Sequence, residues 1–495
     1  MSSIINFIQN NVNRTIAYSI LVFFVLVIIY VSVRIDYRIG ILISLLPFLF
    51  LVLMAIIHYP FLGFSIIFII NYFISGFYRY VPSIPTGITM DFVTVVFFIC
   101  LVMSNFNGST RIKFNNIYNG LTLASFIWIL YCLFQLLNPA AASTIAWFQS
   151  ARGMGLYFFI IVCLASITLT KYFDLKRLLF IWAILCLIAV AKAYVQKTYG
   201  FDPAELRWLY NGGGGRTHLL VTGVRYFSFF TDAANFGTGI AFSGVIFGIS
   251  SFYFKKPALK VFYLLTAAAC GYGMLISGTR GSLAVPFVAL TVFVFLSKNV
   301  KAMILTGIMI ATSFYLLKNT NFGEWNVYIR RMRTAFNTED PSFMVRVENQ
   351  RKLRTYMWDK PFGAGIGMAR QRSDNYQADK FLAKIPTDSW YVLIWVETGI
   401  VGLILHVLLL LYIVVHGAYL VLFRLKNREV KGVTTAMICG ISGIYVASYS
   451  IEIFGQFPTG FILYTCMTFV FLSPIYDKEL EDKKLQKVKE YETIT

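Results

Sequence analysis

The chain has 495 residues, of which 58% are hydrophobic and only 13% are charged, and its formal net charge is +20. Soluble domains carry about 25% charged residues, so this composition leaves too little polar surface for a water-soluble protein and predicts an integral membrane protein. In a soluble protein such a positive charge would suggest nucleic acid. Here the basic residues lie mostly between apolar runs, which favours membrane topology and lipid headgroups as their role and no nucleic-acid partner.

Apolar runs long enough to span a bilayer, about 20 residues, follow one another along the chain. They lie at 17–33, 39–57, 61–76, 88–105, 119–137, 154–170, 177–195, 233–252, 259–277, 281–297, 300–317, 389–423, 434–451 and 458–474. No small-residue cleavage site follows the first run, so we expect a helix there rather than a signal peptide. The run at 389–423 exceeds one span and is expected to begin at the interface or to protrude from the membrane. The predicted fold is all-α: a polytopic transmembrane helical bundle of about 12–14 helices.

The charges of the short loops predict the orientation of the bundle. Lysines and arginines concentrate in alternate loops, as expected of cytoplasmic loops: Lys171, Lys176, Arg177, Lys255, Lys256, Lys260, Lys298, Lys301, Arg424, Lys426, Arg428 and Lys431. By parity the N-terminus also lies in the cytoplasm, although this places Arg34 and Arg38 outside. We therefore predict a single transmembrane domain over 1–476 and a charged cytoplasmic tail over 477–495.

Parity then places two long loops, 196–232 and 318–388, on the outer side of the membrane. Connections of this length are seldom simple linkers, so we expect short helices and part of the functional site in the second loop. That loop is strongly basic, with Arg330, Arg331, Arg333, Arg346, Arg351, Lys352, Arg354, Arg370 and Arg372. Long loops are exempt from the positive-inside rule, so this charge suggests an anionic ligand.

Three arginines lie at or near apolar segments on the predicted outer side: Arg225, Arg280 and Arg346. A charge at membrane depth costs about 2.5 kcal/mol or more, so it usually has a function. Guanidinium groups bind phosphate oxygens with two parallel hydrogen bonds, and several together would hold a pyrophosphate. Alternatively, each could snorkel to the interface or pair with a nearby acid such as Asp232. Both interpretations stay open for Arg225, whereas the very short turn around Arg280 favours function.

Asp388 lies where the second outer loop re-enters the membrane, in the segment Pro-Thr-Asp-Ser-Trp-Tyr. We expect partial desolvation, which would raise its proton affinity, while a nearby arginine would lower it. Such a carboxylate could accept a proton from a hydroxyl nucleophile. The alternative is that Asp388 caps the following helix. Glu397, deeper in that helix, is expected to be structural and to pair with an arginine.

No metal or cofactor pattern is present in the sequence. The seven cysteines lie inside apolar segments without CxxC or zinc-site spacing, and the four histidines are scattered. The glycine run 212–215 is interpreted as a flexible turn, because no phosphate-loop Lys-Ser/Thr follows it.

The order of these motifs resembles the O-antigen ligase and polymerase superfamily. The motifs are Arg-x-x-x-Phe-x-x-Asp-x-x-Asn from Arg225, Ser-x-x-Arg-Gly around Arg280, Pro-x-Gly-x-Gly-x-Gly from Pro361, and Glu-x-Gly-x-x-Gly from Glu397. The resemblance covers about 220–420. It implies a GT-C-like membrane glycosyltransferase of the bacterial inner membrane that uses an undecaprenyl-pyrophosphate-linked glycan, with its active site facing the periplasm.

The resemblance also implies roles for individual residues. Arg225, Arg280 and Arg346 would bind the pyrophosphate, and Asp388 would act as the catalytic base without a metal or cofactor. Ligases commonly have His followed by Asn or Ser at the position of Asp388, so this departure favours a polymerase. Further support or sugar contacts would come from Asp232, Asn235, Trp358, Trp390, Tyr391 and Glu397, although such aromatic residues more often belong to the core or the interfacial belt.

The resemblance implies an inverting transfer that polymerises repeat units of a surface polysaccharide, such as O-antigen, capsule or exopolysaccharide. The alternatives are an O-antigen ligase or a protein O-oligosaccharyltransferase with the same donor, so the acceptor is a glycan, a lipid or a protein. A lipid-linked sugar transporter or flippase is the alternative of another class. Transporters often have internal repeats and broken helices, and the sequence shows neither clearly.

Overall fold

The computed structural model describes residues 19, 22–106, 114–141, 143–220, 223–298, 300–321, 323–336, 341–369 and 380–494. Within these ranges 12 helices are long and apolar enough to cross a membrane. Two shorter apolar helices, Val22–Arg34 and Met303–Asn319, fall on two further predicted runs. The prediction of an all-α polytopic bundle is thus confirmed. The beginning of the run at 17–33, together with Arg370 and Arg372, lies outside the described residues.

The chain divides into two compact units. The first comprises Met1–Gly63 and Val96–Arg111, and the second comprises Phe64–Val95 and Ile112–Thr495. The first unit contains helix α2 (Tyr37–His58), while α3 (Pro60–Tyr80) and α4 (Thr86–Phe106) have residues in both. Every candidate site residue lies in the second unit, which is therefore the one described below.

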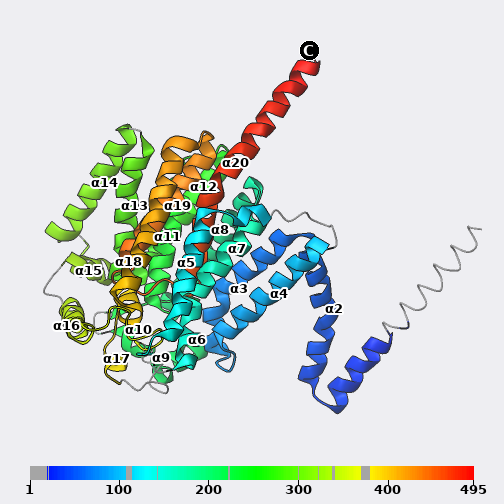
Figure 1. Cartoon of the computed structure of the whole chain (residues 1–495), viewed down its shortest axis with the longest axis horizontal. Coiled ribbons are helices and arrows are strands. Elements are labelled where there is room, and N and C mark those ends of the chain that lie inside the picture. The colour runs from blue at the N-terminus through cyan, green and yellow to red at the C-terminus, as the bar shows by residue number, and fades with distance from the viewer. Residues whose placement is uncertain are drawn as a thin grey trace, which may run out of the picture. The chain divides into compact units, whose positions relative to one another are not determined.

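The second unit continues through helices joined mostly by short turns (Figure 1). In chain order they are η1 (Phe114–Ile117), α5 (Gly120–Phe134), η2 (Gln135–Leu137), α6 (Thr144–Ala151), η3 (Arg152–Leu156), α7 (Tyr157–Thr168), α8 (Tyr172–Thr198), α9 (Pro203–Asn211), α10 (Gly215–His218), α11 (Ala233–Ser251), α12 (Pro257–Ile276), η4 (Arg280–Leu283), α13 (Ala284–Ser297), α14 (Val300–Asn319), α15 (Val327–Arg333), η5 (Thr334–Phe336), α16 (Pro341–Tyr356), α17 (Lys380–Lys384), α18 (Trp390–Tyr419), η7 (Leu420–Arg424), α19 (Arg428–Ala447) and α20 (Thr459–Ile494). The described strands, β1 (Leu219–Leu220) and β2 (Gly223–Val224), form one antiparallel pair.

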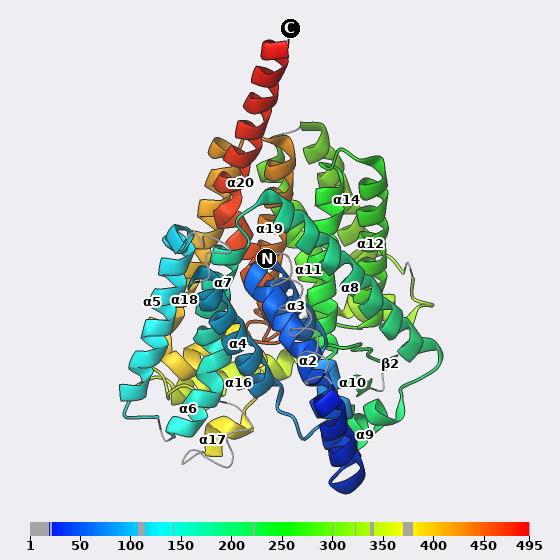
Figure 2. The same ribbon diagram turned by 90° about the vertical axis from the view of Figure 1, so that its right-hand side faces the viewer.

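Helices α11, α19 and α20 form the interior of this unit. In α19, 89% of the spanning window is buried inside the bundle, against 28% in α12. Glycines let α19 approach its neighbours: a Cβ on Gly440 would lie 2.8 Å from the Phe242 ring of α11, and one on Gly443 would lie 2.6 Å from the Val285 carbonyl oxygen of α13. Small residues at helix contacts are typical of membrane proteins, where close backbone approach replaces the hydrophobic driving force. Figure 2 shows the same helices from the side.

Helix α18 is broken at Gly399, which has φ 73° and ψ −177°. The Pro-x-Gly-x-Gly-x-Gly segment packs into the break: the Ala364 and Gly365 N–H groups donate to the carbonyls of Val396 (2.8 Å) and Glu397 (3.1 Å). A side chain on Gly399 would overlap the Pro361 carbonyl oxygen. The long run at 389–423 is thus two helical segments, so the protein does contain a broken helix, contrary to the expectation from the sequence.

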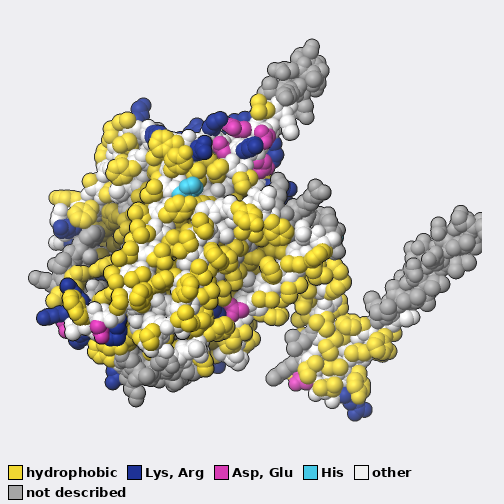
Figure 3. Space-filling view, in the orientation of Figure 1, with side chains coloured by type: hydrophobic (Ala, Val, Ile, Leu, Met, Phe, Trp, Pro, Cys, Tyr) yellow, Lys and Arg dark blue, Asp and Glu magenta, His cyan; other side chains and the backbone are white. Residues whose placement is uncertain are grey.

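The loops with concentrated lysine and arginine lie at one end of this unit. Lys176 forms an ion pair with Glu429, and Lys298 Nζ donates to the Leu422 carbonyl at 3.1 Å. Figure 3 shows basic side chains at both ends of the bundle and a largely hydrophobic surface between them. Such a band suits the hydrocarbon layer of a membrane.

Candidate active site

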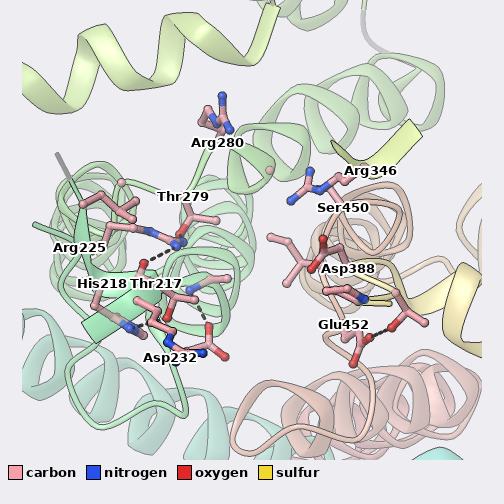
Figure 4. Close-up of a pocket in the computed structure, with 18 of the residues that line it drawn as sticks. Thr217, His218, Arg225, Asp232, Thr279, Arg280, Arg346, Asp388, Ser450 and Glu452 are labelled. Atoms are coloured by element: carbon pink, nitrogen blue, oxygen red, sulfur yellow. Dashed lines mark hydrogen bonds between the residues drawn. The ribbon is translucent and has the colours of Figure 1, made fainter. Parts of the chain in front are cut away.

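A cavity of about 570 Å³ lies at the end of the second unit opposite the short basic loops. Its lining comes from the segment before α11, the η4 turn, α15, α16, the start of α18 and the connection between α19 and α20 (Figure 4). Five arginines and three carboxylates take part: Arg216, Arg225, Arg280, Arg331, Arg346, Asp232, Asp388 and Glu452. The three arginines and the aspartate predicted as pyrophosphate ligands and base thus gather in one place.

Arg225 is fixed by two neutral oxygens. Its Nη1 donates to the Thr217 carbonyl at 3.0 Å, and its Nη2 donates to Thr279 Oγ1 at 2.9 Å. Its buried Nε has no hydrogen-bond partner among the described residues. Burial lowers the pKa of Arg225, while the carboxylate of Asp232 opposes that shift. An arginine keeps its charge even so, and the guanidinium is therefore oriented but still able to bind an anion.

The predicted alternative partner of Arg225, Asp232, has a structural function. It is the N-cap of α11 and accepts hydrogen bonds from the N–H groups of Ala234 (2.7 Å) and Asn235 (2.9 Å). A carboxylate at a helix N-terminus satisfies free N–H groups and interacts favourably with the helix dipole. Asp232 thereby fixes the start of the helix that borders the cavity.

Gly278 brings a further arginine next to Arg225. Its φ of 59° lies in the left-handed region, and a Cβ there would lie 3.3 Å from Arg331 Cδ and 3.4 Å from Arg225 Cγ. The two arginine side chains therefore flank the same glycine. Sequence analysis did not single out Arg331 because it is one of many basic residues in the second long loop.

Arg280 lies in the turn η4 and donates from Nη1 to Thr334 Oγ1 at 3.0 Å. The next residue, Gly281, packs so closely on the α19–α20 connection that a Cβ would overlap the Ser450 hydroxyl. This contact brings the arginine turn beside the acidic part of the cavity. Arg346 of α16 lies across the cavity from Arg225 in Figure 4, is partly exposed, and lines the cavity.

Asp388 lines the cavity in an unusual backbone conformation, with φ 49°. The helix cap considered as its alternative role belongs to Ser389, whose side chain accepts a hydrogen bond from the Val392 N–H at 3.4 Å. Asp388 is exposed, so the expectation that it is partly desolvated is wrong. A positive φ favours Asn, Asp and His among residues with side chains. The geometry therefore suits Asp388 as well as the His that ligases commonly have there.

Glu452 is the cavity carboxylate that sequence analysis missed. It lies in the α19–α20 connection and accepts a hydrogen bond from the Thr387 hydroxyl, one residue before Asp388. A signal was present, because Glu452 is the only charged residue between the apolar runs at 434–451 and 458–474. The reasoning applied to Arg280, a single charge in a very short turn, also applies to Glu452.

His218 is buried beside the cavity, but both of its ring nitrogens are engaged. Nδ1 contacts the Gly214 carbonyl at 2.8 Å, and Nε2 accepts from the Ala233 N–H at 3.0 Å. Because Nε2 must be an acceptor, the ring is neutral, and burial lowers the pKa of His218 to about 4. His218 is therefore not available to accept a proton, and it anchors the glycine turn at 212–215 to α11.

Arg79, on the last turn of α3, supports the segment between Arg225 and Asp232. Its Nη1 donates to the Ser228 carbonyl at 2.8 Å, and its Nη2 to the Thr231 carbonyl at 3.1 Å. Its guanidinium also lies over the Phe227 ring, 4.2 Å from the ring centre. Sequence analysis missed this residue, although an arginine at the end of an apolar run was the available signal.

Two predicted support residues lie in the packed interior rather than in the cavity. Asn235 is fully buried and donates from Nδ2 to the Phe457 carbonyl at 2.9 Å, which ties α11 to the α19–α20 connection. Trp390 is also fully buried, and its Nε1 donates to His406 Nε2 at 2.9 Å. The expected sugar contact of Trp390 is therefore corrected, because no face of its ring is accessible.

The remaining predicted contacts also lie outside the cavity lining. The Tyr391 hydroxyl donates to the Tyr445 carbonyl at 2.7 Å. Glu397 is fully buried and accepts from the Ala369 N–H at 3.4 Å, so its contact to the glycine-rich segment is to backbone. Trp358 is 86% exposed. Among the described residues no three His, Cys, Asp or Glu side chains are grouped as metal ligands would be.

Residues 265–407 match the family model described as O-Antigen ligase. The matched region contains Arg280, Arg331, Arg346 and Asp388, whereas Arg225 and Glu452 lie outside it. A comparison with curated proteins finds no match. The family match agrees with the motif order in the sequence and with the polytopic helical fold. Residues 265–407 are thus similar to the O-antigen ligase family, and this similarity supports the resemblance of this membrane protein to the O-antigen ligase and polymerase superfamily.

Proposed function

We propose that this protein is an inverting, metal-independent glycosyltransferase of the GT-C-like type that polymerises repeat units of a surface polysaccharide. The donor in this proposal is an undecaprenyl-pyrophosphate-linked glycan. The observation that supports it best is the gathering of Arg225, Arg280 and Arg346 with the exposed Asp388 around one cavity. Transfer from a pyrophosphate ester to a hydroxyl acceptor needs cationic groups for the leaving pyrophosphate and a nearby base for the hydroxyl proton.

The arginines would hold the leaving group. Arg225 is oriented by neutral oxygens and keeps its positive charge for a ligand. Guanidinium groups form paired, charge-assisted hydrogen bonds with phosphate oxygens. As the bond between the anomeric carbon and the phosphate oxygen breaks, negative charge grows on the pyrophosphate. Donors already in place stabilise that charge without reorganisation.

Asp388 would act as the general base. In the proposed step the acceptor hydroxyl oxygen bonds to the anomeric carbon from the face opposite the pyrophosphate. The hydroxyl proton passes to the Asp388 carboxylate, and the electron pair of the broken bond leaves with the pyrophosphate. Attack from the opposite face inverts the anomeric configuration. The exposed carboxylate beside the arginines supports this role.

The proposed location is the bacterial inner membrane, with the cavity open to the periplasm. The cavity borders the N-terminal end of α11 and the C-terminal end of α19, whereas the basic loops join the opposite ends of the same helices. The positive-inside rule assigns those basic loops to the cytoplasm. The cavity would then face the side where lipid-linked glycans are joined.

The broken helix α18 makes a lipid-linked sugar transporter the second candidate function. In transporters the unwound backbone of broken helices coordinates the substrate or its ions. Here the carbonyls freed at the break are already occupied: Glu397 accepts from the Gly365 N–H, and Thr398 accepts from the Tyr131 hydroxyl at 2.9 Å. Gly399 also lies outside the cavity lining. We therefore interpret the break in α18 as a support for the large loop rather than as a substrate site of a transporter.

The experiment is a gel of surface polysaccharide from a deletion strain complemented with variants. We expect single repeat units in the deletion strain and a restored ladder with the wild type. Asp388→Asn should lower polymer formation by about 100-fold or more, as removal of a general base does. Arg280→Ala should also abolish the ladder, and Arg280→Lys should restore little because lysine lacks the forked geometry.

The matched control is Arg351→Ala, an exposed arginine of α16 outside the cavity lining, which should leave the ladder unchanged. All variants are compared at equal amounts in the membrane. Long polymer that stays on the lipid carrier in the deletion strain would indicate a ligase instead of a polymerase. An unchanged ladder in the deletion strain would contradict glycan transfer to surface polysaccharide and favour protein glycosylation or transport.

A further inference from the structure

The start of α18 is tied to the α19–α20 connection on both sides of Asp388. Before it, the Thr387 hydroxyl donates to the Glu452 carboxylate. After it, the Trp390 N–H donates to the Ser448 carbonyl at 3.0 Å. Asp388 thus lies between two hydrogen bonds that reach the same connection. Its backbone, with φ 49°, is in a region that residues with side chains rarely adopt.

Asp adopts a positive φ more readily than most residues with side chains, but the conformation is still uncommon and persists only where the surrounding structure favours it. Among the described residues, support for this conformation comes through the neighbours of Asp388 in the chain. Thr387 is buried at 7% exposure, and its hydroxyl reaches the partly buried Glu452. This contact links the residue before Asp388 to the α19–α20 connection.

We propose that Glu452 is a positioning residue that, through Thr387, holds Asp388 in the conformation that presents its carboxylate to the cavity. The inference rests on the proposed function, in which Asp388 is the base. What the contact requires of residue 452 is an oxygen that accepts a hydrogen bond. Gln has such an oxygen and lacks the charge, which allows the positioning role to be separated from a direct role of the carboxylate.

The test measures transfer by purified full-length protein in detergent. The substrate is the lipid-linked glycan extracted from the deletion strain. Thr387→Val has nearly the same shape as threonine but cannot donate, and Glu452→Ala removes the acceptor. Both should lower kcat by about 10-fold or more while KM for the donor changes less than about twofold, because a misplaced base affects the transition state and not donor binding.

The conservative variants should behave differently. Thr387→Ser keeps the hydroxyl and Glu452→Gln keeps an acceptor oxygen, so each should retain kcat within about threefold of the wild type. The double variant Thr387→Val/Glu452→Ala should be no worse than the more affected single variant, since both remove one interaction. Thermal unfolding of each variant reports whether it is folded. If Glu452→Ala does not fold, Thr387→Val decides the outcome.

Two results would overturn the positioning role. In the first, Glu452→Gln is as inactive as Glu452→Ala, while Thr387→Val has a kcat near that of the wild type. This result would mean that the charge of Glu452 matters rather than its hydrogen bond to Thr387. The other is near wild-type kcat for both Thr387→Val and Glu452→Ala. Asp388→Asn is assayed alongside: if it transfers glycan at the wild-type rate, the base assignment itself fails. If it is inactive while the pair variants are normal, only the positioning role is lost.

Discussion

At the scale of single residues, Arg225 has the arrangement that the proposed anion site requires. Arg225 is held by a backbone carbonyl and a threonine hydroxyl, and neither oxygen carries a charge to neutralise it. Thr279, which holds Arg225, itself donates to the Ala233 carbonyl at 2.8 Å. This chain of neutral contacts fixes the guanidinium before a ligand arrives, and preorganised charges stabilise a growing anion best.

His218 is expected to make the stability of the predicted outer loop at 196–232 dependent on pH. Burial lowers its pKa to about 4, below the ordinary value near 6.5, so folding favours the neutral ring. Its contribution is complete above about pH 6.5 and is lost as the pH falls towards 4, to a total of about 3 kcal/mol. We expect the wild-type unfolding midpoint in detergent to fall between about pH 7 and pH 4.5, and to fall less in His218→Gln. An equal fall of the unfolding midpoint in the wild type and in His218→Gln would contradict this prediction.

The sequence could locate the charged residues of the site, but it could not determine their burial. Arg280 and Asp388 are charges at the ends of apolar runs, a pattern that needs no knowledge of packing. Trp390 lies two residues after Asp388, and Asn235 ends the motif that begins at Arg225, yet both side chains are fully buried. Whether a side chain faces the cavity depends on contacts with α19 and α20, which lie far along the chain.

At the scale of elements, the break in α18 connects the large loop to the bundle. Val401 donates to the Pro361 carbonyl at 3.3 Å, beside the bonds from Ala364 and Gly365. These contacts fix the end of the loop that follows α16, the helix with Arg346. The sequence predicted an apolar run of excess length but not its break, because glycine is common in uninterrupted membrane helices as well.

Gly399→Ala should disrupt this junction. The new Cβ would overlap the Pro361 carbonyl oxygen, and φ 73° is unfavourable for alanine, so we expect a loss of at least about 2 kcal/mol and a lower unfolding midpoint. The matched control is Gly271→Ala in α12, where nothing lies within 4 Å of the new Cβ. It should unfold at or above the wild-type midpoint, as helical Gly→Ala changes do. Equal effects of the two substitutions would show that the break is not sterically required.

At the scale of the whole molecule, the family match and the site cover different parts of the chain. The O-antigen ligase match at residues 265–407 includes η4 and the large loop. Arg225 and Glu452 come from segments on either side of it and complete the cavity. The apolar runs predicted the order of the helices but not that the segments with Arg225 and Glu452 meet at one cavity. The packing of α11 against α19, which brings the two outer segments together, depends on glycine contacts between helices distant in sequence.

The distribution of charge over the second unit predicts its orientation in the membrane. Lys256, between α11 and α12, belongs to the basic end, and Trp358, which follows α16, is 86% exposed near the opposite end. In spheroplasts a membrane-impermeant maleimide should label Trp358→Cys, whereas Lys256→Cys should react only after lysis. The native cysteines are buried except for the partly buried Cys163, so the unmodified chain is the background control. The reverse labelling pattern would place the cavity in the cytoplasm, where the proposed periplasmic transfer could not occur.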